Sequence, residues 1–267
     1  MTRQETFRQL HESGCFVMPN PWNPGVAQLL ERIGFRALAT TSSGFGWSIG
    51  LADAAVPLDQ ALAHFRAMVG GVDVPINADF RDGYAVDPDG VAINVTRVVE
   101  TGVAGLSIED STGDPASPLF EFALAVERIR AARRAIDATG SGVVLTGRSE
   151  GFIAGRPDLD ETIRRLEAYA DAGAECLFAP GIRTREQIVA VVNAVAPKPV
   201  NVLVGTDFAT VDELAAIGVR RISVGGSLSR VGWTAALEAA MEIADRGTFT
   251  RLGSALPFSG LNRPRRP

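Results

Sequence analysis

The stretch Pro75-Ile-Asn-Ala-Asp-Phe-Arg-Asp-Gly-Tyr-Ala85 places carboxylates directly after an apolar, strand-like run. A second run, Ala104-Gly-Leu-Ser-Ile-Glu-Asp110, ends in the same way. In a parallel α/β protein, the position that follows a buried strand lies at the edge of the sheet where active sites are built. Carboxylates that end neighbouring strands predict a site for Mg²⁺ or Mn²⁺, because hard cations prefer oxygen ligands.

Apolar runs of this kind recur along the chain. Most are continuously apolar rather than alternating, as expected for strands that are buried on both faces. Helical patterns separate them, with apolar residues at i, i+3 and i+4, and several have Thr or Asp near the start and Gly at the end. The eight predicted strands are 15–20, 37–41, 75–80, 105–109, 142–147, 176–179, 199–204 and 221–225. Eight strands that alternate with eight helices predict an α/β fold, a (β/α)8 TIM barrel, with a doubly wound sheet as the alternative.

The length and composition of the chain predict one domain. The 267 residues, 46% of them hydrophobic, suffice for one large core and lie in the usual range for a single barrel. No linker or change of composition divides the sequence. We therefore predict a single domain over residues 1–267, in which 247–267 form a C-terminal arm beyond the eighth unit that packs on a neighbour.

Charge and cysteine usage exclude several classes of partner. The net charge is −5, and the only basic block is the tail from Arg263 to Arg266, so we expect no nucleic acid partner. No apolar run approaches the roughly 20 residues that cross a membrane, and the polar start of the chain lacks the core of a signal peptide. Two cysteines in apolar runs, Cys15 and Cys176, suit a reducing compartment, which favours a cytoplasmic protein.

Polar side chains gather at the predicted strand ends. In chain order they are Thr40, Thr41, Ser42, Ser43, Asp79, Arg81, Asp82, Glu109, Asp110, Arg148, Glu150, Asn201 and Ser223. Such a set suits a small anionic substrate held by a metal, an arginine and hydroxyl or backbone N–H donors. An Asp that follows a strand is often only a turn or cap residue, and this alternative applies to Asp53, Asp82 and Asp110. The two histidines, His11 and His64, fall on predicted helices, which disfavours histidine acid–base catalysis.

At this point the chain resembles the isocitrate lyase/phosphoenolpyruvate mutase superfamily. The matching segments are TTSSGFGWSIGLAD (40–53), PINADFRDGYA (75–85), VVETGVAGLSIED (98–110), LTGRSEGF (145–152) and KPVNVLVG…ELAAIGVRRISVGGSL (198–228). The resemblance implies a barrel of the phosphoenolpyruvate/pyruvate type, usually a homotetramer, with a C-terminal helix exchanged between subunits. It also implies Mg²⁺ and a small anionic 2-oxo acid, whose C–C or P–C bond is made or broken through an enolate-like species held on the metal.

The resemblance also implies roles for individual residues. Asp79 matches the acid most directly tied to the metal and Glu109 a second acid in its shell. Asp82 joins this set as compensation for Arg81, which stands where the family commonly has an acid. The expected catalytic residues are Arg148, which grips the substrate carboxylate, Glu150, which orients Arg148 or metal-bound waters, and the more distant acid Asp53. The expected substrate-binding residues are Thr41, Ser42, Ser43, Arg81, Arg148 and Asn201.

The place of Arg81 has two alternatives. Because it follows Asp79 by two, it points to the same face if the strand continues, and would then face a dianionic substrate. Otherwise it turns away and pairs with Asp82 or Asp110. We predict the substrate-facing position.

The loop after the fourth strand departs from the family. The segment DSTGDPASPLFEF (110–122) lacks the lyase cysteine loop and the lysine and asparagine of the mutase loop. A reaction that needs no acid from this loop fits best, and oxaloacetate decarboxylation is the simplest case. The alternatives are a retro-aldol lyase of the 2-methylisocitrate or dimethylmalate type, a phosphonopyruvate hydrolase or phosphonomutase, and a non-catalytic ligand-binding relative.

Overall fold

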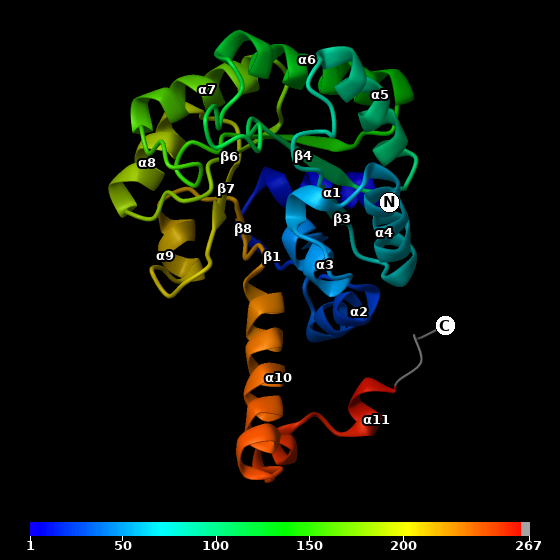
Figure 1. Cartoon of the computed structure of the whole chain (residues 1–267). Helices are drawn as coiled ribbons and strands as arrows, with labels where there is room; N and C mark the ends of the chain where they lie inside the picture. Colours follow the sequence, from blue (N-terminus) through cyan, green and yellow to red (C-terminus); the bar gives the residue numbers. More distant parts are fainter. Residues whose placement is uncertain (263–267) are drawn as a thin grey trace.

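The apolar runs of the sequence form eight parallel strands that curl into a nearly closed barrel (Figure 1). In this computed structural model, which describes residues 1–262, the sheet order is β1-β8-β7-β6-β5-β4-β3-β2. The strands are β1 (Phe16–Met18), β2 (Leu38–Ala39), β3 (Ile76–Asp79), β4 (Gly105–Glu109), β5 (Val144–Arg148), β6 (Cys176–Phe178), β7 (Val200–Leu203) and β8 (Arg221–Ser223). Each overlaps its predicted strand, so the (β/α)8 barrel is confirmed and the doubly wound sheet is excluded.

The seam of the barrel lies between β1 and β2. The described residues form no strand ladder there, but the Ala39 amide donates to the Pro19 carbonyl at 3.1 Å. The side chain of Asn20 adds a second link, because its Nδ2 donates to the Thr40 carbonyl at 2.9 Å. Asn20 Oδ1 also accepts from the amides of Val224 and Gly225, at 2.9 Å each. The residues that follow β1, β2 and β8 are therefore tied together.

Most of the helices cover the outside of the barrel (Figure 1). The helices of the described residues are α1 (Arg3–Glu12), α2 (Pro24–Ile33), α3 (Ser42–Ser48), α4 (Leu58–Gly71), α5 (Pro88–Val99), α6 (Phe122–Thr139), α7 (Leu159–Asp171), α8 (Arg185–Ala194), α9 (Val211–Ala216), α10 (Ser227–Arg246) and α11 (Phe258–Leu261). Two short 3₁₀ turns, η1 (Asp53–Ala55) and η2 (Thr250–Ser254), complete the set. The eight predicted helices are all present. Helix α3 was not predicted, because the glycine-rich sequence from Ser42 to Gly50 is typical of a loop.

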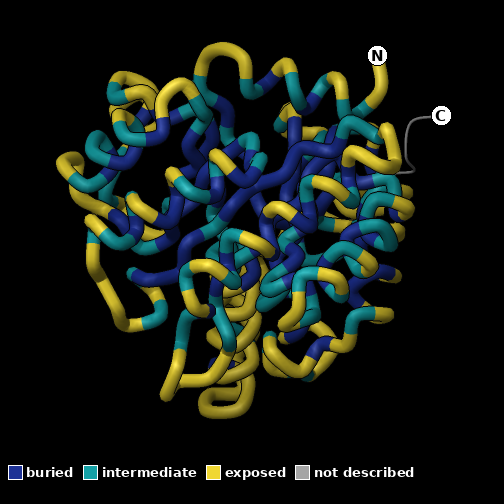
Figure 2. Tube along the Cα trace, turned by 90° about the horizontal axis from the view of Figure 1, so that it is seen from above, coloured by how far each residue is buried: buried dark blue, intermediate teal, exposed yellow. Residues whose placement is uncertain are grey.

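Two layers of apolar side chains fill the molecule. The larger packs between the strands and the surrounding helices, which leaves the strands buried at the centre of the molecule (Figure 2). The smaller lies at the amino-terminal end of the barrel, where α1 inserts Phe7 and Leu10 against Phe16 and Val144. Gly105 permits this contact, because a Cβ at that position would lie 2.5 Å from the Phe7 ring. Helix α1 therefore closes one end of the barrel and leaves the other end for a site.

Helix α10 projects away from the barrel (Figure 1). Of its side chains only Ser229 and Glu242 are buried, whereas Val231, Leu237 and Met241 are 60–67% exposed. The predicted arm begins at Gly247 and continues through η2 and α11. Its basic end, Arg263 to Arg266, lies outside the described residues. Within residues 1–262, no helix is both long and apolar enough to span a membrane.

Candidate active site

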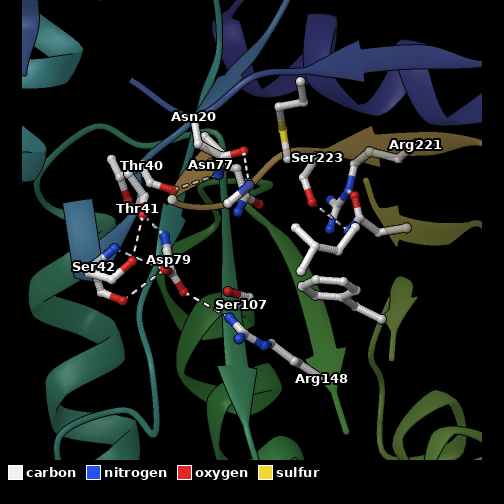
Figure 3. A pocket seen from close by; sticks show the side chains of 18 of the residues that line it. Asn20, Thr40, Thr41, Ser42, Asn77, Asp79, Ser107, Arg148, Arg221 and Ser223 are labelled. Carbon is white, nitrogen blue, oxygen red and sulfur yellow. Dashed lines mark hydrogen bonds and ion pairs between the residues drawn. The ribbon is translucent and has the colours of Figure 1, made fainter. Parts of the chain in front are cut away.

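A cavity of about 270 Å³ opens at the carboxyl ends of the strands. Every strand of the barrel contributes to its lining, which includes many polar side chains (Figure 3). The lining residues with polar side chains are Asn20, Thr40, Thr41, Ser42, Ser43, Asp53, Asn77, Asp79, Ser107, Arg148, Asn201, Arg221 and Ser223. The predicted residues Thr41, Ser42, Ser43, Asp53, Asp79, Arg148 and Asn201 are thus brought together around one space.

Asp79 is the last residue of β3 and is held from the side of α3. Its Oδ2 accepts from the Ser42 amide at 3.0 Å and from the Ser42 hydroxyl at 2.9 Å. Its own amide donates to Thr40 Oγ1 at 2.9 Å. Helix α3 starts at this point because the Thr41 side chain caps it, accepting from the Gly44 amide at 3.2 Å. The cap of α3 therefore determines where the Asp79 carboxylate lies.

Arg148 is the last residue of β5 and the centre of an acidic cluster. Its Nη1 lies 3.2 Å from Asp79 Oδ1 and 3.3 Å from Glu109 Oε2, and its Nε donates to Glu150. Strand register explains the contact, because Glu109 on β4 is paired directly with Arg148. Burial opposes the charge of the guanidinium, but Glu150, Glu109 and Asp79 together raise its pKa above the ordinary value. Nη2 has no hydrogen-bond partner among the described residues.

Burial and mutual repulsion disfavour the ionised forms of the acids around Arg148. Burial raises the pKa of Glu109 well above its ordinary value, Arg148 opposes this shift, and the neighbouring charges of Glu150 and Asp79 add to it. Burial also raises the pKa of Glu150, again against the effect of Arg148. If all three acids are ionised, their charge exceeds that of the one arginine. A cation bound here would lower the free energy of the ionised acids.

Asp53 lies in η1 and supplies an oxygen without a partner. Its Oδ1 is buried and has no hydrogen-bond partner among the described residues, the nearest cation being Arg81 Nε at 4.0 Å. Burial and the charge of Asp79 raise the pKa of Asp53. The Asp53 carboxylate thus lines the cavity with free coordination capacity.

The donor set fits a hydrated Mg²⁺. No group of three or more Asp, Glu, His or Cys side chains within residues 1–262 is arranged to hold a metal directly. Mg²⁺ commonly binds through one or two carboxylates and keeps several waters, so a complete protein cage is not required. The unpartnered oxygen of Asp53 and the carboxylate of Asp79, both on the cavity wall, are the residues that would hold it. Glu109 contacts the same Arg148 nitrogen as Asp79 but does not line the cavity.

Arg81 and Asp82 lie elsewhere than predicted. Strand β3 ends at Asp79, and Arg81 adopts a left-handed backbone with φ of 48°, so the alternation of a strand no longer applies. Arg81 Nη1 donates to the Asp53 carbonyl at 3.1 Å, and the guanidinium lies 5.3 Å from the centre of the Tyr84 ring. Asp82 Oδ1 accepts from the Tyr84 amide at 3.1 Å, as a turn residue does. Neither side chain lines the cavity.

Asp110 belongs to the support of the site. It is 2% exposed, and its carboxylate accepts from the Glu150 amide at 2.7 Å and the Tyr169 hydroxyl at 2.6 Å. Arg165 Nη1 completes the set at 3.2 Å. The segment that carries Glu150 is therefore fastened to β4 and α7.

The polar interior of the barrel was not predicted from the sequence. Asn77, Ser107 and Arg221 line the cavity, and each precedes a predicted site residue of its own strand by two. Arg221 precedes Ser223 by two, so both point to the same face of β8. A charged residue two before a predicted site residue was the signal that could have revealed it.

A comparison with protein families matches residues 7–244 to the phosphoenolpyruvate phosphomutase model. Among curated relatives, the oxaloacetate decarboxylase of Paraburkholderia xenovorans is 30% identical over 73% of this chain and 66% of its own length.

Two solved structures share the whole architecture. A protein from Burkholderia cenocepacia, assigned only to the lyase/mutase class, is 44% identical over 97% of this chain and 95% of its own, with a TM-score of 0.95. A phosphonopyruvate hydrolase in complex with oxalate and Mg²⁺ is 27% identical over 98% of this chain and 93% of its own, with a TM-score of 0.85. The similarity therefore extends over nearly all of the chain.

Proposed function

The chain belongs to the isocitrate lyase/phosphoenolpyruvate mutase superfamily, and from this premise we propose that it is a Mg²⁺-dependent lyase of a small 2-oxo dicarboxylate. The proposed reaction cleaves the C–C bond beside the substrate carbonyl, and oxaloacetate decarboxylation is its simplest form. The observation that carries the proposal is Arg148, held by three acids beside a small polar cavity with one nitrogen left for a ligand.

Arg148 binds the carboxylate of the 2-oxo acid. The guanidinium is held through Nη1 and Nε by Asp79, Glu109 and Glu150. Because its side chain is already fixed, Nη2 binds the substrate with little further loss of conformational entropy. Lysine cannot replace this fork, since it has a single point charge. Thr41, Ser42 and Ser43 line the same cavity. The linked hydroxyls of Thr41 and Ser43 can donate to the remaining oxygens of the substrate, whereas the Ser42 hydroxyl already donates to Asp79.

Asp53 and Asp79 are the proposed ligands of Mg²⁺, with Glu109 behind them. When bound, Mg²⁺ acts as a Lewis acid that stabilises the negative charge developing on the ketone oxygen. Arg148 stabilises the adjacent carboxylate as the bond breaks. Arg81 orients Asp53 through the hydrogen bond to its carbonyl.

The proton that completes the reaction comes from water in this proposal. No residue of the loop from Ser111 to Phe122 lines the cavity, and the loop is instead closed on itself by a bridge between Ser111 and Leu119. Decarboxylation needs no dedicated acid from that loop. Efficient cleavage of isocitrate or of a methyl-substituted relative would need one, so these should be poor substrates.

The proposed assembly is a homotetramer in which α10 is exchanged between subunits. The large apolar side chains exposed along α10 and the arm, from Val231 to Phe258, support it, because a concentration of exposed apolar side chains suits an interaction site. A second copy of this chain is the expected occupant.

The experiment that tests the proposed function is a substrate panel with Mg²⁺. Oxaloacetate, 2-methylisocitrate, isocitrate, 2,3-dimethylmalate and phosphonopyruvate would be incubated with the protein, and pyruvate, glyoxylate, CO₂ and phosphate would be measured. We expect release of pyruvate and CO₂ from oxaloacetate well above the rate with Mg²⁺ alone. Turnover of phosphonopyruvate in preference to oxaloacetate would contradict the proposal and indicate a P–C bond enzyme.

A further inference from the structure

A second arginine, Arg221, lines the same cavity and has no part in the chemistry proposed above. It is the first residue of β8 and is 1% exposed. Its side chain crosses the interior of the barrel and joins three elements. Nε donates to Asn201 Oδ1 on β7 at 2.9 Å, Nη2 donates to Thr146 Oγ1 on β5 at 3.0 Å, and Nη1 lies 3.2 Å from His11 Nε2 on α1.

All three partners of Arg221 are uncharged. Burial and the Arg221 charge lower the pKa of His11 to about 3, so its ring is neutral near pH 7. The His11 Nδ1 lies 2.7 Å from the Phe7 carbonyl, which leaves Nε2 to accept from Arg221. Within residues 1–262, no carboxylate forms an ion pair with Arg221, in contrast to the three that surround Arg148. A buried cation without a counter-charge raises the free energy of the folded protein. An anion bound beside Arg221 would offset this cost.

The same arginine has donors to spare. A guanidinium carries five N–H groups, and three of those of Arg221 have partners within the described residues. Asn201 donates through Nδ2 to Ser223 Oγ at 2.9 Å, which leaves the Ser223 hydroxyl hydrogen to point elsewhere. Arg221, Asn201 and Ser223 all line the cavity. Figure 3 places Arg221 and Ser223 beside each other and away from the pair of Asp79 and Arg148.

The cavity therefore has two different ends. At one end Arg148 is already neutralised by acids and recognises a carboxylate by geometry. At the other end Arg221 is not neutralised and attracts negative charge. A monoanionic ligand satisfies only one of these ends.

We propose that Arg221, together with Ser223, binds a second anionic group of the substrate, so that the cavity selects dianionic over monoanionic acids. This inference rests on the proposed function only in taking this cavity as the substrate site. It gives to Arg221 the recognition of a second anionic group that the sequence had suggested for Arg81.

The test compares two unreactive four-carbon ligands that differ in the second carboxylate, malate and 2-hydroxybutyrate. Their dissociation constants would be measured by calorimetry with Mg²⁺ present. We expect the wild-type protein to bind malate at least about tenfold more tightly, as a charge-assisted contact provides. Arg221→Gln should bring the two dissociation constants to within about threefold of each other.

A second variant keeps the proposal testable if Arg221→Gln does not fold. Thr146 lies outside the cavity lining, and Thr146→Asp would place a carboxylate beside Arg221 Nη2 and neutralise it in place. It should abolish the preference for malate, whereas the matched neutral variant Thr146→Asn should keep it.

The inference would be overturned if the wild-type protein bound malate no more tightly than 2-hydroxybutyrate. It would also be overturned if Arg221→Gln or Thr146→Asp kept the wild-type preference for malate. The readout is binding, so failure of the proposed reaction is seen separately, as a lack of turnover in the substrate panel.

Discussion

At the scale of single residues, Arg148 decides what the site can bind. Arg148→Lys should reduce kcat/KM for the 2-oxo acid by about 100-fold or more, because one ammonium cannot contact Asp79, Glu109 and Glu150 and also present a nitrogen to the substrate. Steady-state kinetics would measure the effect, and circular dichroism would check the fold. The exposed Arg156 offers a matched control, as Arg156→Lys should leave the kinetics unchanged. Kinetics of Arg148→Lys close to the wild type would remove this residue from the site.

At the scale of elements, α3 depends on a stacking contact with α4. The Phe45 and His64 rings stack with centroids 3.9 Å apart, and burial lowers the pKa of His64 to about 4. Folding thus favours the neutral ring. The contribution of His64 to the free energy of unfolding is fully present above its unfolded-state pKa of about 6.5. This contribution is lost as the pH falls through the folded-state pKa of about 4. The difference between the two pKa values of His64 corresponds to at most roughly 3–4 kcal/mol of unfolding free energy.

Replacement of His64 tests this linkage. His64 Nε2 has no hydrogen-bond partner among the described residues, so His64→Phe removes the titration without breaking a hydrogen bond to that nitrogen. Between pH 6.5 and 4, the variant should lose less unfolding free energy than the wild type, as measured by urea denaturation at each pH. His11 titrates in both proteins and cancels in the difference. Identical pH profiles would show that His64 does not contribute.

The loop that follows β5 depends on Asp110. Asp110→Asn should destabilise the protein by about 2–3 kcal/mol, because Arg165 loses one of its two carboxylate partners and keeps only Glu161. The same change should lower kcat, since the Glu150 amide is held by this carboxylate. Tyr169→Phe is the control, as it removes one hydrogen bond to Asp110 and should cost only about 1 kcal/mol. Equal effects of the two variants on stability would argue against a charge-based role.

The elements also show how far the sequence predicts this protein. Continuous apolar runs identify strands that are buried on both faces, so the barrel and the positions of Asp79, Glu109 and Arg148 at strand ends followed from the sequence. Helix α3 did not, because its start depends on one cap, Thr41, in a sequence rich in glycine. The position of Arg81 was predicted wrongly because β3 ends at Asp79, two residues before it. Arg221 was missed because its partners come from β5, β7 and α1, which lie far apart in the sequence, and its one local signal was its place two residues before Ser223.

At the scale of the whole molecule, α10 tests the proposed assembly. Leu237 and Met241 are each 60% exposed on this helix, and Leu237→Glu with Met241→Glu should shift the protein to smaller species. Ile93 on α5 is 65% exposed, so Ile93→Glu is a matched control that should leave the assembly unchanged. Sedimentation velocity would measure the distribution. A wild-type protein that sediments as a monomer would contradict the assembly.

The central claim is that the cavity at the carboxyl end of the barrel is the site of a Mg²⁺-dependent 2-oxo acid lyase. The most direct measurement is the initial rate of pyruvate formation from oxaloacetate as Mg²⁺ is titrated, for the wild type and for Asp79→Asn. Mg²⁺ without protein gives the background. We predict a saturable, Mg²⁺-dependent rate that falls by about 1,000-fold or more in Asp79→Asn, since both metal and Arg148 lose their carboxylate. A wild-type rate equal to the background, or one that Asp79→Asn retains, would contradict the claim.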